Sequence, residues 1–256
     1  PPVVQQKWQA PVDELQGLPG FAQAFLPRGR APNVGELFQF KAAAKALRAI
    51  ALSKGSAFYG GEIAHAIEKF SKANGGSLTA RDLENFKPEW VKPIEKNYRG
   101  YTLHEIPPNG QGIAALIALG ILDKFDLASL AVDGVDSQHV QIEAMKLAFA
   151  DLQEFVADPD AMQSVSANDL LDKGYLAARA KLIDPDRAAP ARPGSPHGGG
   201  TVYLTAADEN GMMVSFIQSN FKGFGSGVVV PNTGIALHNR GWGFTLKPGH
   251  PNQVAP

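Results

Sequence analysis

The residue with the clearest chemical potential is a threonine at the point where a glycine run meets a predicted strand. Thr201 follows Gly198–Gly200 and opens the run Thr201–Ala207. Cleavage between Gly200 and Thr201 would give Thr201 its own α-amino group, which can take the hydroxyl proton during attack on a carbonyl. The hydroxyl can make this cut itself by attacking the Gly200 carbonyl to form an ester that water then opens. Glycine leaves that carbonyl accessible and tolerates the backbone strain of the attack.

The local pattern alone leaves a simpler interpretation open. A threonine at the start of a strand is usually a β-branched residue that fits the pleated surface. Ser219, at the end of the next predicted strand, is likewise either a polar residue that closes a strand or a hydroxyl that orients a nucleophile. The elements that position these two residues therefore matter.

Apolar spacing predicts helices over most of residues 35 to about 185. The spacing predicts one helix over 31–51 and another from Ile113 to about Phe125. A longer amphipathic helix is expected to open at Asp136 or Ser137. Its apolar face is expected to consist of residues spaced three or four apart: Ile142, Met145, Phe149, Leu152 and Val156.

A change of composition separates this helical part from a β-rich part. Residues 184–200 contain four prolines and a glycine run, which predicts a linker without helix. Beyond it, Thr201–Ala207 and Met212–Ser219 flank the dipeptide Asn210-Gly211. Asn-Gly between two β-rich runs is the strongest short-range signal for a hairpin. The sequence therefore predicts a hairpin that begins at Thr201.

Motifs in a fixed order along the chain resemble the gamma-glutamyltranspeptidase family, which belongs to the N-terminal nucleophile hydrolases. The part up to Gly200 resembles the large subunit of the family, and the part from Thr201 resembles the start of the small subunit. The motifs that carry the resemblance are Phe58–Ile63, Leu78–Leu83, Tyr98–Tyr101, Pro107–Gly112, Glu143–Asp151, Gly199–Leu204, Asp208–Gly211, Phe224–Val228 and Thr233–Asn239. They cover nearly the whole chain, so the resemblance is specific.

This resemblance implies a fold and a way of maturing. The fold is an α/β (α+β) four-layer αββα sandwich, which this chain would form only in part. The resemblance also implies autoproteolysis between Gly200 and Thr201. Residues 1–200 are then the C-terminal part of the large subunit, and residues 201–256 are the start of the small subunit. Thr201 stands at the place of the family's nucleophile, and Ser219, eighteen residues on, at the place of a hydroxyl that hydrogen-bonds it.

The chain departs from the family pattern where the family holds the α-amino group of a γ-glutamyl donor. The family uses an Asn two residues beyond the second hydroxyl; here that residue is Phe221, and Asn220 stands one residue early. The segment His238–Phe244 has no carboxylate, and Arg240 has the wrong charge to bind an ammonium group. In these departures the chain resembles an acylase-like branch of the family. Asn220, Asn239 and Arg240 are the candidate substrate-binding residues.

The activity implied by the resemblance is that of an N-terminal threonine hydrolase that cleaves γ-glutamyl amides, such as glutathione, through an acyl-enzyme. The alternative substrate class is the acylated β-lactam or glutaryl amide of cephalosporin acylases, and the non-catalytic alternative is a folded but inactive fragment. In the family, a region before Pro1 supplies an Arg for the donor carboxylate, and a region after Pro256 supplies the glycine amides of the oxyanion hole. Activity is therefore expected only of the full-length, processed zymogen. The expected partners are a small-molecule amide and the two subunits of one precursor.

Composition argues against several other classes of function. The net charge of −1, without a basic block, offers no electrostatic surface for nucleic acid or an acidic membrane. The absence of cysteine excludes a thiolate metal site and a cysteine nucleophile. His139 and Glu143 have the spacing of two metal ligands, but no third ligand is suggested, so we expect an exposed hydrogen-bonding pair and neither metal nor cofactor. No apolar run approaches the roughly 20 residues of a membrane span. With no targeting segment in view, a soluble protein of the cytoplasm or periplasm is expected.

Overall fold

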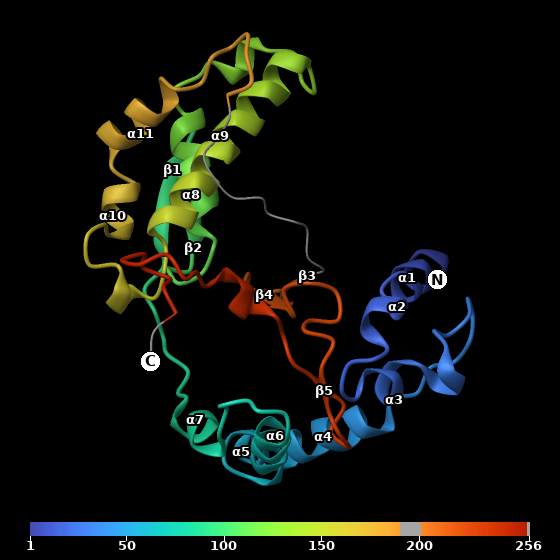
Figure 1. The fold of residues 1–256 in the computed structure, drawn as a ribbon. Coiled ribbons are helices and arrows are strands. Elements are labelled where there is room, and N and C mark those ends of the chain that lie inside the picture. The colour runs from blue at the N-terminus through green and yellow to red at the C-terminus, as the bar shows by residue number, and fades with distance from the viewer. Residues whose placement is uncertain (190–200, 255–256) are drawn as a thin grey trace. The chain divides into compact units, whose positions relative to one another are not determined.

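The computed structural model describes residues 1–189 and 201–254 (for residues 201–203, the backbone only). Helices and short two-stranded sheets alternate along these residues (Figure 1). They form two compact units, one from Pro1–Pro88 with Gly198–Gly241 and the other from Glu89–His197 with Trp242–Pro256. Each unit draws on both sides of the predicted cleavage point. The division into 1–200 and 201–256 concerns the covalent chain after cleavage and stays a prediction.

The first unit contains the helices α1 (Pro2–Gln9), α2 (Val12–Leu15), α3 (Phe21–Phe25), η1 (Pro27–Gly29), α4 (Lys41–Leu52), α5 (Ser56–Tyr59), α6 (Glu62–Ala73) and α7 (Ala80–Asn85), and the strands β3 (Thr201–Ala207), β4 (Met213–Ser219), β5 (Val229–Val230) and β6 (Ile235–Ala236). The second unit contains β1 (Ile94–Tyr98), β2 (Tyr101–Glu105), α8 (Ile113–Leu122), η2 (Leu127–Ser129), α9 (Val135–Phe155), η3 (Pro159–Ala161), α10 (Ala167–Leu170) and α11 (Lys173–Ala180). The short turn η4 (Arg240–Gly243) spans the boundary. The strands pair antiparallel as β1–β2, β3–β4 and β5–β6.

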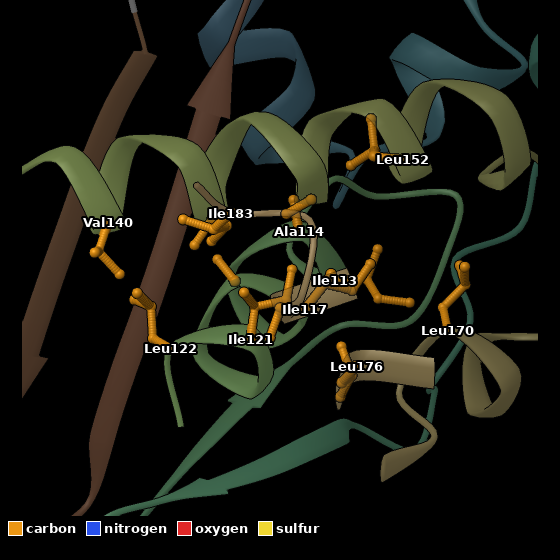
Figure 2. Packing of buried hydrophobic residues seen from close by; sticks show 14 of the residues in the cluster. Ile113, Ala114, Ile117, Ile121, Leu122, Val140, Leu152, Leu170, Leu176 and Ile183 are labelled. Atoms are coloured by element: carbon orange, nitrogen blue, oxygen red, sulfur yellow. The ribbon is translucent and has the colours of Figure 1, made fainter. Parts of the chain in front are cut away.

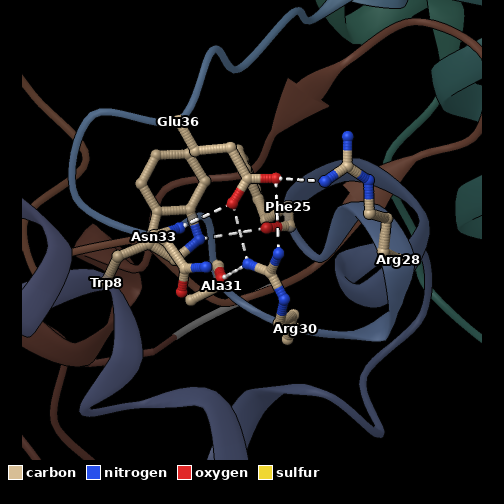
Figure 3. Close-up of polar contacts among 7 residues, drawn as sticks. All are labelled: Trp8, Phe25, Arg28, Arg30, Ala31, Asn33 and Glu36. Atoms are coloured by element: carbon tan, nitrogen blue, oxygen red, sulfur yellow. Dashed lines mark hydrogen bonds and ion pairs between the residues drawn. The ribbon is translucent and has the colours of Figure 1, made fainter.

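An aromatic cluster joins the N-terminal helices to the loop that follows β4. The ring of Phe224 lies 4.8 Å from that of Phe25, 5.2 Å from Phe21 and 5.6 Å from Trp8, in tilted or edge-to-face contacts. Trp8 also donates from Nε1 to the Phe25 carbonyl at 3.0 Å (Figure 3). The start of the chain therefore holds the loop that follows Ser219, about 200 residues further on.

Glycine is required at one of these close approaches. Gly225 has a φ of +68°, and a Cβ atom on it would lie 2.4 Å from the carbonyl oxygen of Leu237. The loop after β4 can therefore lie directly on the residues that follow β6 only because Gly225 has no side chain.

The helix predicted over 31–51 is wrong in its first half, because α4 begins only at Lys41. Upstream of it, the carboxylate of Glu36 accepts hydrogen bonds at 2.8 Å from both Arg28 and Arg30 (Figure 3). The hydrogen bond from Arg30 is the main cause that lowers the pKa of Glu36 from its ordinary value. These contacts fix the preceding residues in a non-helical course, which apolar spacing cannot reveal.

Helix α8 is the centre of the second unit's core. Ile113, Ile117 and Ile121 are fully buried and lie among side chains of α9 and α11, including the fully buried Leu176 (Figure 2). Because several elements pack around α8, eight of its ten residues are buried. The helix predicted to begin at Ile113 is confirmed and ends at Leu122.

The apolar face predicted for helix α9 is confirmed at Leu152 and Val156, which are buried in this core, but not at Ile142 and Met145. The helix begins at Val135, so Asp136 and Ser137 lie inside it. Ile142 and Met145, expected in the core, are 55% and 40% exposed. The buried hydrophobic residues are Val140, Ala144, Ala148 and Leu152. Small alanines at positions 144 and 148 let α8 approach closely, so large apolar side chains are not required along the whole contact face of α9.

The same helix holds the segment that leads to the predicted linker. Glu143, 3% exposed, accepts a hydrogen bond from Lys146 Nζ at 2.6 Å and another from the Ala189 N–H at 3.2 Å. Lys146 Nζ also donates to the Ala189 carbonyl. One turn earlier on α9, His139 Nε2 lies 2.8 Å from the carbonyl oxygen of Asp184. His139 and Glu143 therefore each bind this segment, in place of the exposed pair that the spacing predicted.

The Glu143–Lys146 pair gives a prediction about stability. Burial raises the pKa of the Glu143 carboxyl, but the hydrogen bonds from Lys146 and Ala189 outweigh burial and hold the pKa below its ordinary value. We expect Lys146→Met to lower the free energy of unfolding by about 1–3 kcal/mol at pH 7, because a buried carboxylate keeps only one of these donors. Urea unfolding measures this loss.

The pH dependence of that loss has a definite sign. A carboxyl whose pKa is lowered by folding stabilises the fold above its unfolded pKa, about 4.3 for Glu, and loses this contribution as the pH falls through the folded value. The difference between parent and Lys146→Met is therefore expected to shrink from pH 7 to pH 3. Lys124→Met is the control, since Lys124 forms only a partly exposed ion pair with Asp123. Equal losses from the two variants would contradict the prediction.

Candidate active site

The predicted hairpin is confirmed, and its register sets Thr201 opposite Ser219. Strands β3 and β4 pair antiparallel from Thr201↔Ser219 to Ala207↔Met213. Directly opposed residues in an antiparallel pair share a face, with Cα atoms about 4.5–5.5 Å apart. This hairpin therefore brings Thr201 and Ser219 together although they are eighteen residues apart in the sequence. Gly200, the other half of the predicted cleavage site, lies outside the described residues.

The chain turns sharply after Ser219. The Phe221 N–H donates to Ser219 Oγ at 2.9 Å, and Phe221 itself has a left-handed φ of +76°. This conformation costs most L-residues roughly 1–2 kcal/mol, whereas Asn adopts it several times more often than other residues. Strained residues of this kind gather at functional sites. The strain at Phe221 therefore calls for a functional explanation.

Asn239 ties this turn to the segment after β6. Its N–H donates to the Asn220 carbonyl at 3.2 Å, and its Oδ1 accepts from the Lys222 N–H at 3.0 Å. Since these two bonds reach the backbone on both sides of Phe221, Asn239 fixes the turn. The roles of Asn220 and Asn239 in substrate binding stay predictions.

Arg240 lies over the ring of Phe221. Its guanidinium carbon is 5.2 Å from the ring centroid, and its side chain is exposed at this surface. The attraction uses the flat face of the guanidinium and leaves N–H donors at its edge. In the sequence, Phe221 and Arg240 are two separate departures from the family pattern, and each weakens binding of a donor ammonium group. The structure brings them into one contact, two residues beyond Ser219, which pairs with Thr201 across the hairpin.

The residues that the structure describes offer neither a metal site nor a membrane-spanning helix. Residues 1–189 and 201–254 contain no group of three or more His, Asp and Glu placed to hold a metal ion. Over the same two ranges, no helix combines the length and the apolar character needed to cross a bilayer.

Comparison with known proteins identifies the family. The model of the family described as gamma-glutamyltranspeptidase matches residues 1–256. The chain belongs to this family. Among relatives of the gamma-glutamyltranspeptidase family, it is 38% identical over 245 residues to the glutathione hydrolase-like YwrD proenzyme of Bacillus subtilis (strain 168). It is 36% identical over 245 residues to the oxamate amidohydrolase proenzyme of Klebsiella pneumoniae subsp. pneumoniae.

The coverage of these matches is uneven. Each of the two alignments covers 96% of this chain but 46% of the relative, so the chain spans about half the length of the curated relatives it matches. A solved structure, the cephalosporin acylase from Bacillus halodurans, matches with a TM-score of 0.90 and 48% identity, over 100% of this chain and 47% of that one. The mixed helices and small sheets therefore have the fold of the gamma-glutamyltranspeptidase family, as the order of motifs predicted. The word proenzyme belongs to the names of these relatives.

Proposed function

We propose that the full-length protein is a self-processing N-terminal threonine amidohydrolase that cleaves γ-glutamyl or related acyl amides, such as glutathione. The observation that carries the proposal is the register of β3 and β4, which sets Thr201 opposite Ser219. Membership of a family whose relatives here are hydrolase proenzymes supports it. Cleavage between Gly200 and Thr201 would give the large and small subunits of one precursor.

The proposed reaction runs in two steps through an ester on Thr201. The Thr201 hydroxyl attacks the amide carbonyl while its α-amino group takes the hydroxyl proton. The C–N bond breaks, and the amine leaves with that proton. Water then attacks the ester, which releases the acid and restores the hydroxyl. Ser219 would orient the nucleophile by hydrogen bonding.

The exposed hairpin supports the proposed four-layer sandwich of the full-length protein. Apolar residues lie on both faces of β4, with Met213 and Ile217 80% and 63% exposed on one face, and Val214 and Phe216 54% and 51% exposed on the other. An isolated two-stranded hairpin is marginally stable, and exposed apolar faces need cover. In the αββα arrangement, further strands and a second layer would cover both faces.

A second substrate class is supported by one specific likeness. The solved structure that matches at 48% identity is a cephalosporin acylase, and residues 238–244 contain no carboxylate that could hold a donor ammonium group. Hydrolysis of an acyl group without an amino substituent, including the acyl side chain of a β-lactam, is therefore the alternative to γ-glutamyl cleavage.

The test of the proposal uses the full-length wild-type proenzyme. Intact mass under denaturing conditions is expected to give two fragments that meet at Gly200/Thr201. With a γ-glutamyl anilide we expect slow hydrolysis and less than about twofold stimulation by Gly-Gly as acceptor, because ammonium binding at this site is weak. Strong stimulation by Gly-Gly would contradict the preference for hydrolysis. An uncut chain without amidase activity would leave the inactive module as the better description.

A further inference from the structure

We propose that Arg240, stacked on Phe221, selects the donor by binding a carboxylate at the far end of a short acyl group. This inference rests on the proposed function, since it concerns the acyl group that Thr201 would accept. A glutaryl amide is the matched case, because it differs from a γ-glutamyl amide only in lacking the α-ammonium group. Arg240 would attract the carboxylate of both donors and repel the ammonium group of the second.

The first support is the state of the guanidinium. Within the described ranges, Arg240 forms no ion pair, and its side chain contact is the Phe221 ring at 5.2 Å. An arginine stacked by its face keeps its coplanar N–H donors, which match the two oxygens of a carboxylate. The N–H and the Oδ1 of Asn239 bond the backbone of Asn220 and Lys222, so the segment that carries Arg240 is fixed beside Phe221 before a substrate arrives.

The second support is the length scale. Phe221 is two residues beyond Ser219, at most about 7 Å along the chain, and Ser219 is directly opposite Thr201. The two carbonyl carbons of a five-carbon diacid are about 5 Å apart by standard bond lengths. The two lengths are comparable, so under this proposal a glutaryl group attached at Thr201 would extend its free carboxylate towards Phe221 and Arg240.

The third support is the strain at Phe221. Its φ of +76° suits Asn better than Phe, yet the chain has Phe at this position. A stacking platform for Arg240 and an apolar wall for the acyl chain are functions that Asn cannot supply. The strained residue is thus explained by what its ring does at the surface.

The experiment measures kcat/KM of the processed full-length enzyme with three anilides: glutaryl, γ-glutamyl and the uncharged butyryl. The wild type is expected to prefer glutaryl over both others. In Arg240→Gln, the glutaryl-to-butyryl ratio is expected to fall about 10- to 100-fold, the range for loss of a charge-assisted hydrogen bond. Arg240→Lys should restore part of the ratio, and Arg240→Glu should shift the preference towards γ-glutamyl. Phe221→Asn, which relieves the backbone strain, should also lower the glutaryl preference.

The control variant is Arg48→Gln, which removes the same charge from an exposed arginine of α4. Arg48 belongs neither to the turn after β4 nor to the segment after β6. Its donor ratios are expected to match the wild type. If Arg240→Gln changes the three rates by one common factor, Arg240 has only a structural role and the inference is wrong. If the wild type is unprocessed or hydrolyses none of the three anilides, the proposed function itself fails, which is a different outcome.

Discussion

Replacing Thr201 by alanine in the full-length proenzyme is expected to leave one uncut chain without amidase activity. The hydroxyl of Thr201 is the attacking atom of the proposed cleavage, and the α-amino group that serves as base exists only after that cleavage. Self-cleavage and amide hydrolysis are therefore both expected to fail in this variant. Removal of a nucleophile from a hydrolase typically costs at least about 10⁴-fold in kcat. Intact mass after prolonged incubation and hydrolysis of an acyl anilide measure the two losses on one sample.

Thr201→Ser is the matched variant, because it keeps the hydroxyl and removes only a methyl group. It is expected to process, at a changed rate, and to retain activity once cut. The melting temperature of Thr201→Ala shows whether that variant is folded. Two subunits that still form from a folded Thr201→Ala chain would mean that another protease makes the cut, and the self-processing part of the proposal would be wrong.

Local chemistry made the hairpin predictable from sequence. Asn210-Gly211 stands between two β-rich runs, and Gly211 adopts a φ of +82° in the turn. Once the turn is placed, the pairing register follows, and it fixes the partner of Thr201. The order of motifs added the family, because each motif is short but their order is specific.

Helix α9 shows where sequence reasoning stops. Its period was correctly interpreted as helical, but three of its seven buried residues are polar: Ser137, Glu143 and Asp151. Asp151 is 4% exposed and pairs with Arg179 of α11 at 2.8 Å. Burial raises the pKa of its carboxyl, while Arg179 opposes that rise. A buried charge that depends on a partner 28 residues away leaves no signal in local apolar spacing.

The candidate site, too, could be predicted only in part from the sequence. The pairing of Thr201 with Ser219 was predictable because one hairpin carries both, while their catalytic roles stay predictions. The contact between Phe221 and Arg240 was missed, since it depends on Asn239, which bonds the backbone of a loop 17 and 19 residues earlier in the chain. The sequence signal for this contact is that Phe221 and Arg240 both depart from the family pattern. That signal predicts a contact only when the two departures are considered together.

Ser219→Ala is expected to slow turnover about 10- to 100-fold while the protein stays folded. Ser219 pairs with Thr201 across the hairpin, and under the proposed function its hydroxyl orients the nucleophile. Loss of an orienting hydrogen bond to a reacting group typically costs about 1–3 kcal/mol, which is this range in rate. The measurement is kcat on a sample processed to completion, because incomplete cleavage would imitate a loss of catalysis.

The hydrogen bond to Phe221 complicates this variant, because alanine also removes the acceptor that holds the strained turn. Ser219→Thr separates the two effects, since it keeps an oxygen that can both accept from the Phe221 N–H and donate to Thr201. If Ser219 acts on the nucleophile, Ser219→Thr should restore kcat. The rate loss of Ser219→Ala should then be the same for glutaryl and butyryl anilides. If Ser219 only holds the turn, alanine should change the ratio between these donors, because Phe221 and Arg240 would move, and should lower the melting temperature. An unchanged kcat in fully processed Ser219→Ala would remove Ser219 from the site.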